Sequence, residues 1–288
     1  MSSSSDTTRG LLWGLFGIAT FSLTLPATRV AVTTLHPLFA GAGRAVVAAI
    51  AAALYLWLSR QRWPTRGEWR ALALVSLGAV VGFPIFIALA MQQADASHGG
   101  VVLGILPLMT AAAGALLYRE RPSPLFWWLA LCGSALVLAY SLLHSHGALQ
   151  WGDLSLLLAV LCAAISYAVG ARLAQNLGGL QVISWALVLA LPLLLWPALH
   201  YAPDSLQQPR AVWIGFLYTC FVSQFLGFWP WYKGLALGGI AHVSQVQLLQ
   251  PFLTVLAAAL LLGEPLELLT LVFAVLVVLV VALGRKLR

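Results

Sequence analysis

The chain alternates long, almost purely apolar stretches with short polar connections. A helix needs about 20 apolar residues to cross the hydrocarbon of a bilayer, and it must hydrogen-bond its own backbone amides there. Transmembrane strands would be about half as long and would alternate in polarity. The pattern predicts an all-α integral membrane protein with ten transmembrane helices, covering approximately residues 11–33, 38–58, 70–92, 97–117, 124–143, 152–174, 181–199, 211–233, 240–262 and 267–284.

Composition fits a chain that lies almost wholly in a bilayer. Hydrophobic residues make up 61% and charged residues 8% of the sequence, whereas soluble domains average about 45–50% apolar and about 25% charged residues. The first apolar stretch is longer than the apolar core of a signal peptide and lacks a clear cleavage site, so we expect it to stay as the first span. The lipid bilayer is therefore a predicted partner, and no separate soluble domain is expected.

The basic residues predict the orientation. If the amino terminus is cytoplasmic, 12 of the 15 Lys and Arg residues lie in inner loops or at the two ends, and only Arg210 lies in an outer loop. By the positive-inside rule, both termini are predicted to be cytoplasmic in a multi-pass protein of the cell (inner or plasma) membrane. The net charge of +7 is spread over short loops rather than gathered on one face, so nucleic acid is not an expected partner.

The chain also contains an internal duplication. The segment ADASHGGVVLGILPLMT, residues 94–110, aligns without gaps with GGIAHVSQVQLLQPFLT, residues 238–254. We predict a polar cytoplasmic tail over residues 1–10 and two five-helix repeats, over residues 11–146 and 147–288. Because five is odd, the repeats are inverted in the membrane, an arrangement that suits alternating access to a central site. The alignment pairs His98 with His242, Pro107 with Pro251, Thr110 with Thr254 and Glu120 with Glu264.

Several short motifs add a resemblance to a known family. LLWG in the first span, HPLFAGAGRA at the second, and LLYRERP and LLLGEPL closing the fourth and ninth look like those of the EamA type of the drug/metabolite transporter superfamily. The resemblance covers both halves, although the tenth span has no glycine before Gly284. It implies a carrier that exports small metabolites such as amino acids. Its central cavity would be lined by helices one to four and six to nine, with helices five and ten at the periphery.

Polar residues at mid-depth are candidates for that cavity. At a rise of about 1.5 Å per residue, Ser22, Thr110, Gln224 and Gln250 fall near the bilayer midplane, with Tyr167 and Gln245 close to it. A buried amide without a partner is costly, so these side chains are expected to face protein or water. The predicted substrate-binding set is Ser22, Arg44, Phe83, Tyr167, Trp185, Gln224, His242, Gln245 and Gln250.

Each of these features has a structural alternative. The glutamines fit a substrate-orienting wall or ordinary interhelical hydrogen bonds, and Arg44 fits an anion site or anchoring at the interface. His98 and His242 lie near helix starts, where interfacial bonding competes with proton sensing. The eight acidic residues all fall at span ends or in loops, so we expect no buried carboxylate of the kind that serves proton-driven pumps. Facilitated diffusion or exchange is therefore favoured, with proton coupling left open.

Other classes of function have little support in the sequence. Cys132, Cys162 and Cys220 stand singly in apolar runs, and no HExxH, GxSxG or phosphate-binding loop is present. We expect no catalytic residues, no metal and no cofactor. The predicted function is a secondary transporter, not an enzyme, that exports small metabolites, chiefly amino acids or related polar or amphipathic compounds, by alternating access, as a monomer or homodimer. The alternatives are a drug or cation efflux carrier of the same fold and an intramembrane lipid-modifying enzyme.

Overall fold

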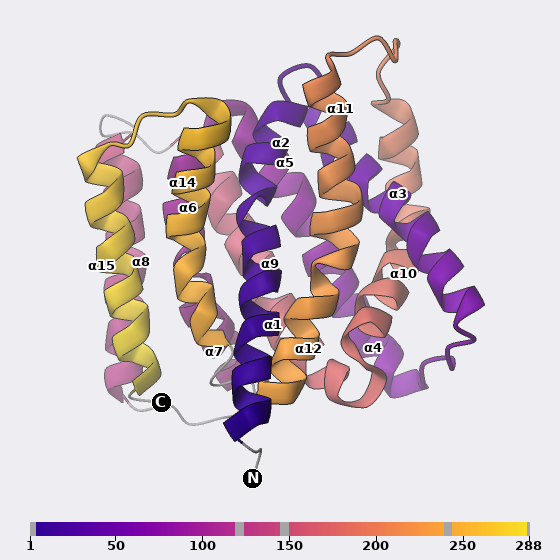
Figure 1. Ribbon diagram of the computed structural model, residues 1–288, viewed down its shortest axis with the longest axis horizontal. Helices are drawn as coiled ribbons and strands as arrows, with labels where there is room; N and C mark the ends of the chain where they lie inside the picture. Colours follow the sequence, from indigo (N-terminus) through magenta and orange to yellow (C-terminus); the bar gives the residue numbers. More distant parts are fainter. Residues whose placement is uncertain (1–3, 119–123, 145–149, 239–243, 287–288) are drawn as a thin grey trace.

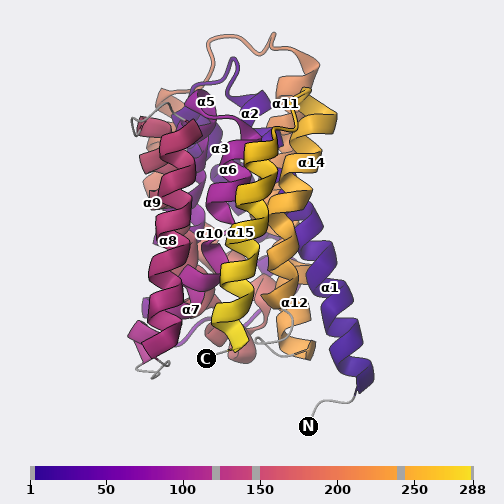
Figure 2. The same ribbon diagram turned by 90° about the vertical axis from the view of Figure 1, so that its left-hand side faces the viewer.

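The computed structural model describes residues 4–118, 124–144, 150–238 and 244–286, and within these ranges the regular structure is entirely helical. Figures 1 and 2 show the helices side by side in one bundle, most of them running from top to bottom in both views. The helices of the first half are α1 (Ser4–Ser22), α2 (Thr24–Ala31), α3 (Pro37–Leu58), α4 (Arg66–Val75), η1 (Ser76–Gly82), α5 (Phe83–Gln93), α6 (Ala96–Leu103), α7 (Leu106–Tyr118) and α8 (Pro124–His144). Those of the second half are α9 (Trp151–Leu177), α10 (Gly179–His200), α11 (Arg210–Leu217), η2 (Tyr218–Leu226), α12 (Phe228–Gly238), η3 (Ser244–Leu249), α14 (Gln250–Leu262) and α15 (Leu268–Lys286).

The all-helical membrane class is confirmed. Seven helical segments in the described ranges are long and apolar enough to cross a bilayer, and three shorter apolar helices cover residues 127–136, 246–262 and 268–280. Each of these segments overlaps one of the predicted spans, while the count of ten spans stays a prediction. The long segments cover Thr8–Ala31, Pro37–Leu58, Arg66–Gln93, Ala96–Tyr118, Trp151–Leu177, Gly179–His200 and Arg210–Gly234.

The fourth and ninth spans change helix at equivalent positions. α7 begins at Leu106 and α14 at Gln250, with Pro107 and Pro251 as second residues, where the missing amide hydrogen costs no helical bond. α6, which comes first in its span, packs on α14, which comes second, while α7 packs on η3. The two spans therefore run antiparallel, as inverted repeats require.

The third and eighth spans also share an irregularity at mid-length. η1 and η2 are π-helical, with bonds such as Gly227 N to Val222 O at 2.7 Å, and η1 aligns with the second part of η2 at the offset of the repeats. Each segment is followed by a proline, Pro84 or Pro230, which has no N–H to donate to the carbonyl four residues earlier. The proline positions thus explain why the chain leaves the α-helical register there.

Small residues bring the two repeats into backbone contact. A Cβ added to Gly234 in α12 would lie 2.6 Å from the backbone nitrogen of Gly14 in α1, and one on Gly215 would lie 2.6 Å from the carbonyl oxygen of Ala27. α1 therefore packs on α12 and α2 on α11, so the first and eighth spans lie side by side. α8 and α15 pair at one edge of the bundle (Figures 1 and 2).

Candidate functional site

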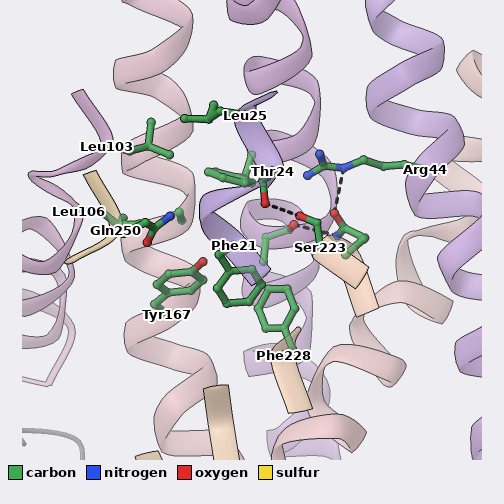
Figure 3. A pocket seen from close by; sticks show the side chains of 14 residues that line it. Phe21, Thr24, Leu25, Arg44, Leu103, Leu106, Tyr167, Ser223, Phe228 and Gln250 are labelled. Carbon is green, nitrogen blue, oxygen red and sulfur yellow. Dashed lines mark hydrogen bonds between the residues drawn. The ribbon is translucent and has the colours of Figure 1, made fainter. Parts of the chain in front are cut away.

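A narrow cavity lies at mid-height where the two repeats meet (Figure 3). Its walls come from α1, α2, α3, η1, α5, α6 and α7 of the first repeat and from α9, η2, α12 and α14 of the second. The cavity leaves about 20 Å³ for the centre of a water-sized molecule, and one water needs about 10–15 Å³ by that measure. The space is therefore too small to hold a metabolite in this structure. Its lining residues are Phe21, Thr24, Leu25, Arg44, Ala79, Phe83, Leu103, Leu106, Ala163, Tyr167, Ser223, Gln224, Phe228 and Gln250.

The one charged group in this lining is Arg44 of α3, whose side chain is 1% exposed. Its Nε donates to Gln224 Oε1 at 3.1 Å, and Gln224 Nε2 donates in turn to the carbonyl oxygen of Ala79 at 3.1 Å. Gln224 belongs to η2 and Ala79 to η1. The amide thus joins the two π-helical segments and supplies the guanidinium with a neutral acceptor.

A second polar contact crosses between the repeats next to Arg44. The hydroxyl oxygens of Thr24 and Ser223 lie 2.7 Å apart, and both side chains are buried. Ser223 precedes Gln224 in η2, and Thr24 begins α2 directly after the break between α1 and α2. Figure 3 shows this hydroxyl pair and the guanidinium facing the same part of the cavity.

The opposite wall combines two further polar groups with aromatic rings. Tyr167 and Gln250 lie across the cavity from Arg44 (Figure 3). The Phe228 ring packs against the rings of Phe21, at a centroid distance of 5.2 Å, and of Tyr167, at 6.3 Å. The cavity is therefore amphipathic, because its walls combine a cation, amides and hydroxyl groups with phenylalanine and leucine side chains.

Two segments of the sequence, residues 8–142 and 150–284, each match the EamA-like transporter family. The chain belongs to that family. The transporter is also 40% identical over 283 residues to the uncharacterized transporter YdeK of Bacillus subtilis (strain 168), a match that covers 98% of this chain and 99% of YdeK. A solved crystal structure of a protein matches 96% of the transporter and 98% of its own chain, with a TM-score of 0.65 and 18% identity, and this likeness concerns the fold alone.

The cavity brings together five of the nine residues predicted to bind substrate: Arg44, Phe83, Tyr167, Gln224 and Gln250. Of the other four, two lie away from the cavity and two have side chains outside the described part of the chain. His242 falls outside the described residues, and Gln245 lies in η3 with its side chain outside them.

Ser22 and Trp185 do not line the cavity. The Ser22 hydroxyl donates to the carbonyl oxygen of Ile18 at 2.8 Å, so this buried serine is satisfied within its own helix. Trp185 packs against Trp63 and Trp69, at centroid distances of 5.0 and 5.6 Å, beside the connection between α3 and α4. The surroundings of Trp185 thus include Trp63, in the connection between α3 and α4, more than 100 residues earlier in the sequence.

Nine of the residues that line the cavity were not in the predicted set, although the sequence carries a signal for some of them. Thr24 lies near mid-depth in the first span, and Ser223 immediately precedes Gln224. Phe21 and Phe228 are harder to single out, because aromatic and aliphatic residues are common throughout these spans. The contribution of Ala79 is a backbone carbonyl, which no side-chain pattern reveals.

A buried polar cluster lies near the ends of α6 and α9, apart from the cavity. His98 Nε2 and Asp153 Oδ1 are 2.7 Å apart, with side chains 2% and 3% exposed. The His98 ring stacks on Tyr140 at 5.0 Å, and the Tyr140 hydroxyl lies 3.1 Å from Thr270 Oγ1. The prediction that no carboxylate is buried is therefore wrong at Asp153, because α6 covers the start of α9, where a sequence shows only a helix end.

Glu264 forms another link at this end of the bundle. Gly263 ends α14 in the left-handed conformation, with φ at 70°, which glycine adopts without strain. The turn directs Glu264 to the start of α6, where its carboxylate accepts from the amides of Ala96 and Ser97, each at 2.9 Å, and from the Ser97 hydroxyl at 2.5 Å. A carboxylate at a helix N-terminus is favoured by both the free amides and the helix dipole.

Proposed function

We propose that this transporter is a secondary carrier that exports small metabolites, chiefly amino acids or related polar or amphipathic compounds, by alternating access. The observation that carries the proposal is the cavity at mid-height, whose polar groups come from both repeats. Binding sites near the midplane at a repeat interface are the usual arrangement in carriers built from inverted repeats. Gln224, Gln250 and Tyr167 would orient the polar part of the substrate, and the phenylalanines would hold its apolar part.

The equivalent irregularities of the two repeats support alternating access. η1 and η2 meet through the bond from Gln224 to the Ala79 carbonyl, and π-helical turns are frequent at functional sites because they loosen the helical register. The fourth and ninth spans are interrupted at equivalent positions as well. In the proposed cycle, exchange of conformation between the repeats opens the cavity to one face and then to the other.

A cation efflux carrier fits the cavity less well. None of the lining residues is acidic, and one of them is an arginine, so a cationic drug would meet an uncompensated like charge in a low-dielectric setting. A lipid-modifying enzyme using His98 is also disfavoured, since His98 is bonded to Asp153 and does not line the cavity.

The test is transport by purified protein in sealed liposomes. Vesicles loaded with unlabelled amino acids would receive external radiolabelled amino acids at symmetric pH, and the assay would be repeated with an imposed pH gradient. Protein-free vesicles are the blank, and a Gln250→Leu variant is the control for passage through the cavity. We expect saturable accumulation of at least one panel member that the variant lacks. Accumulation that is equal in the variant would separate transport from this cavity. No accumulation from amino-acid, organic-acid, sugar or nucleotide panels would overturn the proposal.

The pH arm addresses coupling to protons through the buried His98–Asp153 pair. Uptake that ignores the gradient would establish facilitated diffusion or exchange, which is the mode we propose. Uptake that requires the gradient and loses this requirement in His98→Gln would assign coupling to the pair and overturn that mode.

A further inference from the structure

The chemistry around Arg44 distinguishes between substrate classes. A guanidinium stays protonated in proteins and presents five N–H donors in a planar fork. The Arg44 side chain is 1% exposed, its Nε bonds to an amide oxygen, and its buried Nη1 has no hydrogen-bond partner. Figure 3 shows the guanidinium at the end of its side chain, pointing toward Thr24 and the cavity.

The cavity surface supplies no negative charge to match this cation. The other polar side chains of the lining are Thr24, Tyr167, Ser223, Gln224 and Gln250, all of them neutral. A buried charge without a counter-ion is strongly unfavourable. By contrast, Arg29 of α2 bonds to the Met91 carbonyl oxygen at 2.6 Å and to Asp95 at 3.4 Å. Arg44 is thus the intramembrane arginine that faces the cavity with donor capacity to spare.

We propose that the carried substrate is a small monoanion, with a carboxylate that binds Arg44 and an apolar body that packs on the phenylalanine and leucine side chains. This inference rests on the proposed function, since it names the substrate class of the same cavity. A monoanion neutralises the charge of the site, whereas a zwitterion adds an ammonium group for which the lining has no acidic partner. An amino acid that has lost its amino group, or one whose amine is acylated, therefore fits the site better than the free amino acid does.

Gln224 has a defined place in this arrangement. Its amide oxygen accepts from Arg44 Nε, and its amide nitrogen donates to the Ala79 carbonyl of η1. Gln224 is thus a neutral acceptor for one N–H group of Arg44 when no substrate is bound. A carboxylate makes stronger, charge-assisted and frequently bidentate bonds to arginine. It would bind the N–H groups of Arg44 that Gln224 does not use.

Matched pairs of ligands test the inference directly. The probes are 4-methylpentanoate and leucine, which differ by the ammonium group, and 3-phenylpropanoate and phenylalanine, which differ in the same way. The neutral 3-phenylpropanamide and the cation 2-phenylethylamine complete the set. Binding to the purified full-length protein is measured by calorimetry and by the shift in thermal unfolding, and each probe also competes in the liposome assay.

The expected order is acid first, then amino acid and amide, then amine. The acid of each pair should bind at least about tenfold more tightly, because the ammonium group of the amino acid would be buried without an acidic partner. Arg44→Gln should remove the preference for the acids, and Arg44→Lys should keep part of it because the charge remains. Arg29→Gln is the matched control and should leave the order unchanged. Unliganded melting curves and elution profiles show whether each variant is folded.

Two results would overturn the inference. The first is that the wild-type protein binds the free amino acids as tightly as the matching acids, or more tightly. The second is that folded Arg44→Gln still prefers the acids. If amino acids are still transported through the cavity in those cases, the proposed function stands and only the anionic class fails. If no substrate moves in liposomes, the proposed function fails first.

Discussion

His98 Nε2 and Asp153 Oδ1 lie 2.7 Å apart in the interior, joining α6 of the first repeat to α9 of the second. Replacing one partner leaves the other buried without this bond, which typically costs about 1.5–3 kcal/mol for a bond to a charged group. We expect His98→Gln and Asp153→Asn each to lower the free energy of unfolding by that amount. The double variant should lose less than the sum, because the second change removes a bond already broken. Denaturant unfolding in mixed micelles measures the free energy of unfolding of the wild type, the two single variants and the double variant. If the loss in the double variant equals the sum of the single losses, the two side chains do not interact directly.

The Glu264 carboxylate should stabilise the start of α6 through its charge and its hydrogen bonds. Glu264→Gln keeps the shape of the side chain but removes the charge, so a loss of about 1–2 kcal/mol is expected. Asp204→Asn is the matched control, since Asp204 is an exposed acid in the loop between α10 and α11, and its replacement should stay within about 0.5 kcal/mol. Equal melting temperatures for the two variants would show that the link at α6 contributes nothing to stability.

The close approach of α3 to α5 at Gly41 should not tolerate a methyl group. A Cβ there would lie 2.8 Å from the Cα of Ile85 and 3.0 Å from the carbonyl oxygen of Pro84, and backbone atoms cannot move aside as a flexible side chain can. Gly41→Ala is expected to cost about 1–3 kcal/mol through overpacking. Gly67→Ala places the same methyl where no atom lies within 4 Å, so it should be neutral or slightly stabilising. Thermal unfolding in detergent compares the two, and a neutral Gly41→Ala would show that the helices separate easily.

The cavity glutamine Gln250 should be needed for transport rather than for stability. Gln250→Leu keeps a similar volume but removes one hydrogen-bonding group from the cavity wall, so a loss of about tenfold in transport is expected for a substrate bonded there. Gln92→Leu, at an exposed position near the end of α5, should retain full activity. Initial rates in liposomes at equal protein content decide this. Full activity in Gln250→Leu would remove Gln250 from the substrate path.

The sequence predicts much of the fold because the bilayer imposes a strong length rule on apolar helices. The alignment of Pro107 with Pro251 predicts equivalent positions in the two repeats, and α7 and α14 do begin one residue before them. Pro84 and Pro230 each follow a π-helical segment, because proline disturbs the hydrogen bonding of the helical turn that precedes it. These features follow from local chain chemistry, which a sequence displays directly.

The contents of the site are less visible in the sequence because they depend on which helices meet. Thr24 and Ser223 are 199 residues apart and pair only because the first and eighth spans are neighbours. Asp153 reads as an acid at a helix start, and its burial follows from the position of α6 over that end. Trp185 is a large aromatic residue of the kind that often lines a binding pocket. Its ring instead packs against Trp63 in the connection between α3 and α4, away from the central cavity. The depth of a residue along its span can be predicted from the sequence. The direction in which its side chain points depends on how the helices pack.

The central claim is that the cavity between the repeats opens to each face of the membrane in turn. The most direct measurement uses Ser223→Cys in a chain whose three native cysteines are replaced, with a membrane-impermeant thiol reagent added to one face of sealed vesicles at a time. Gly67 is exposed at the start of α4 and Ser205 is exposed in the connection between α10 and α11, and these two elements lie at opposite ends of the bundle (Figure 1). Gly67→Cys and Ser205→Cys should each be labelled from one face, and they define the two sides. We expect position 223 to be labelled from either face, and more slowly than positions 67 and 205. Labelling of position 223 from one face only, or from neither, would contradict alternating access to this cavity.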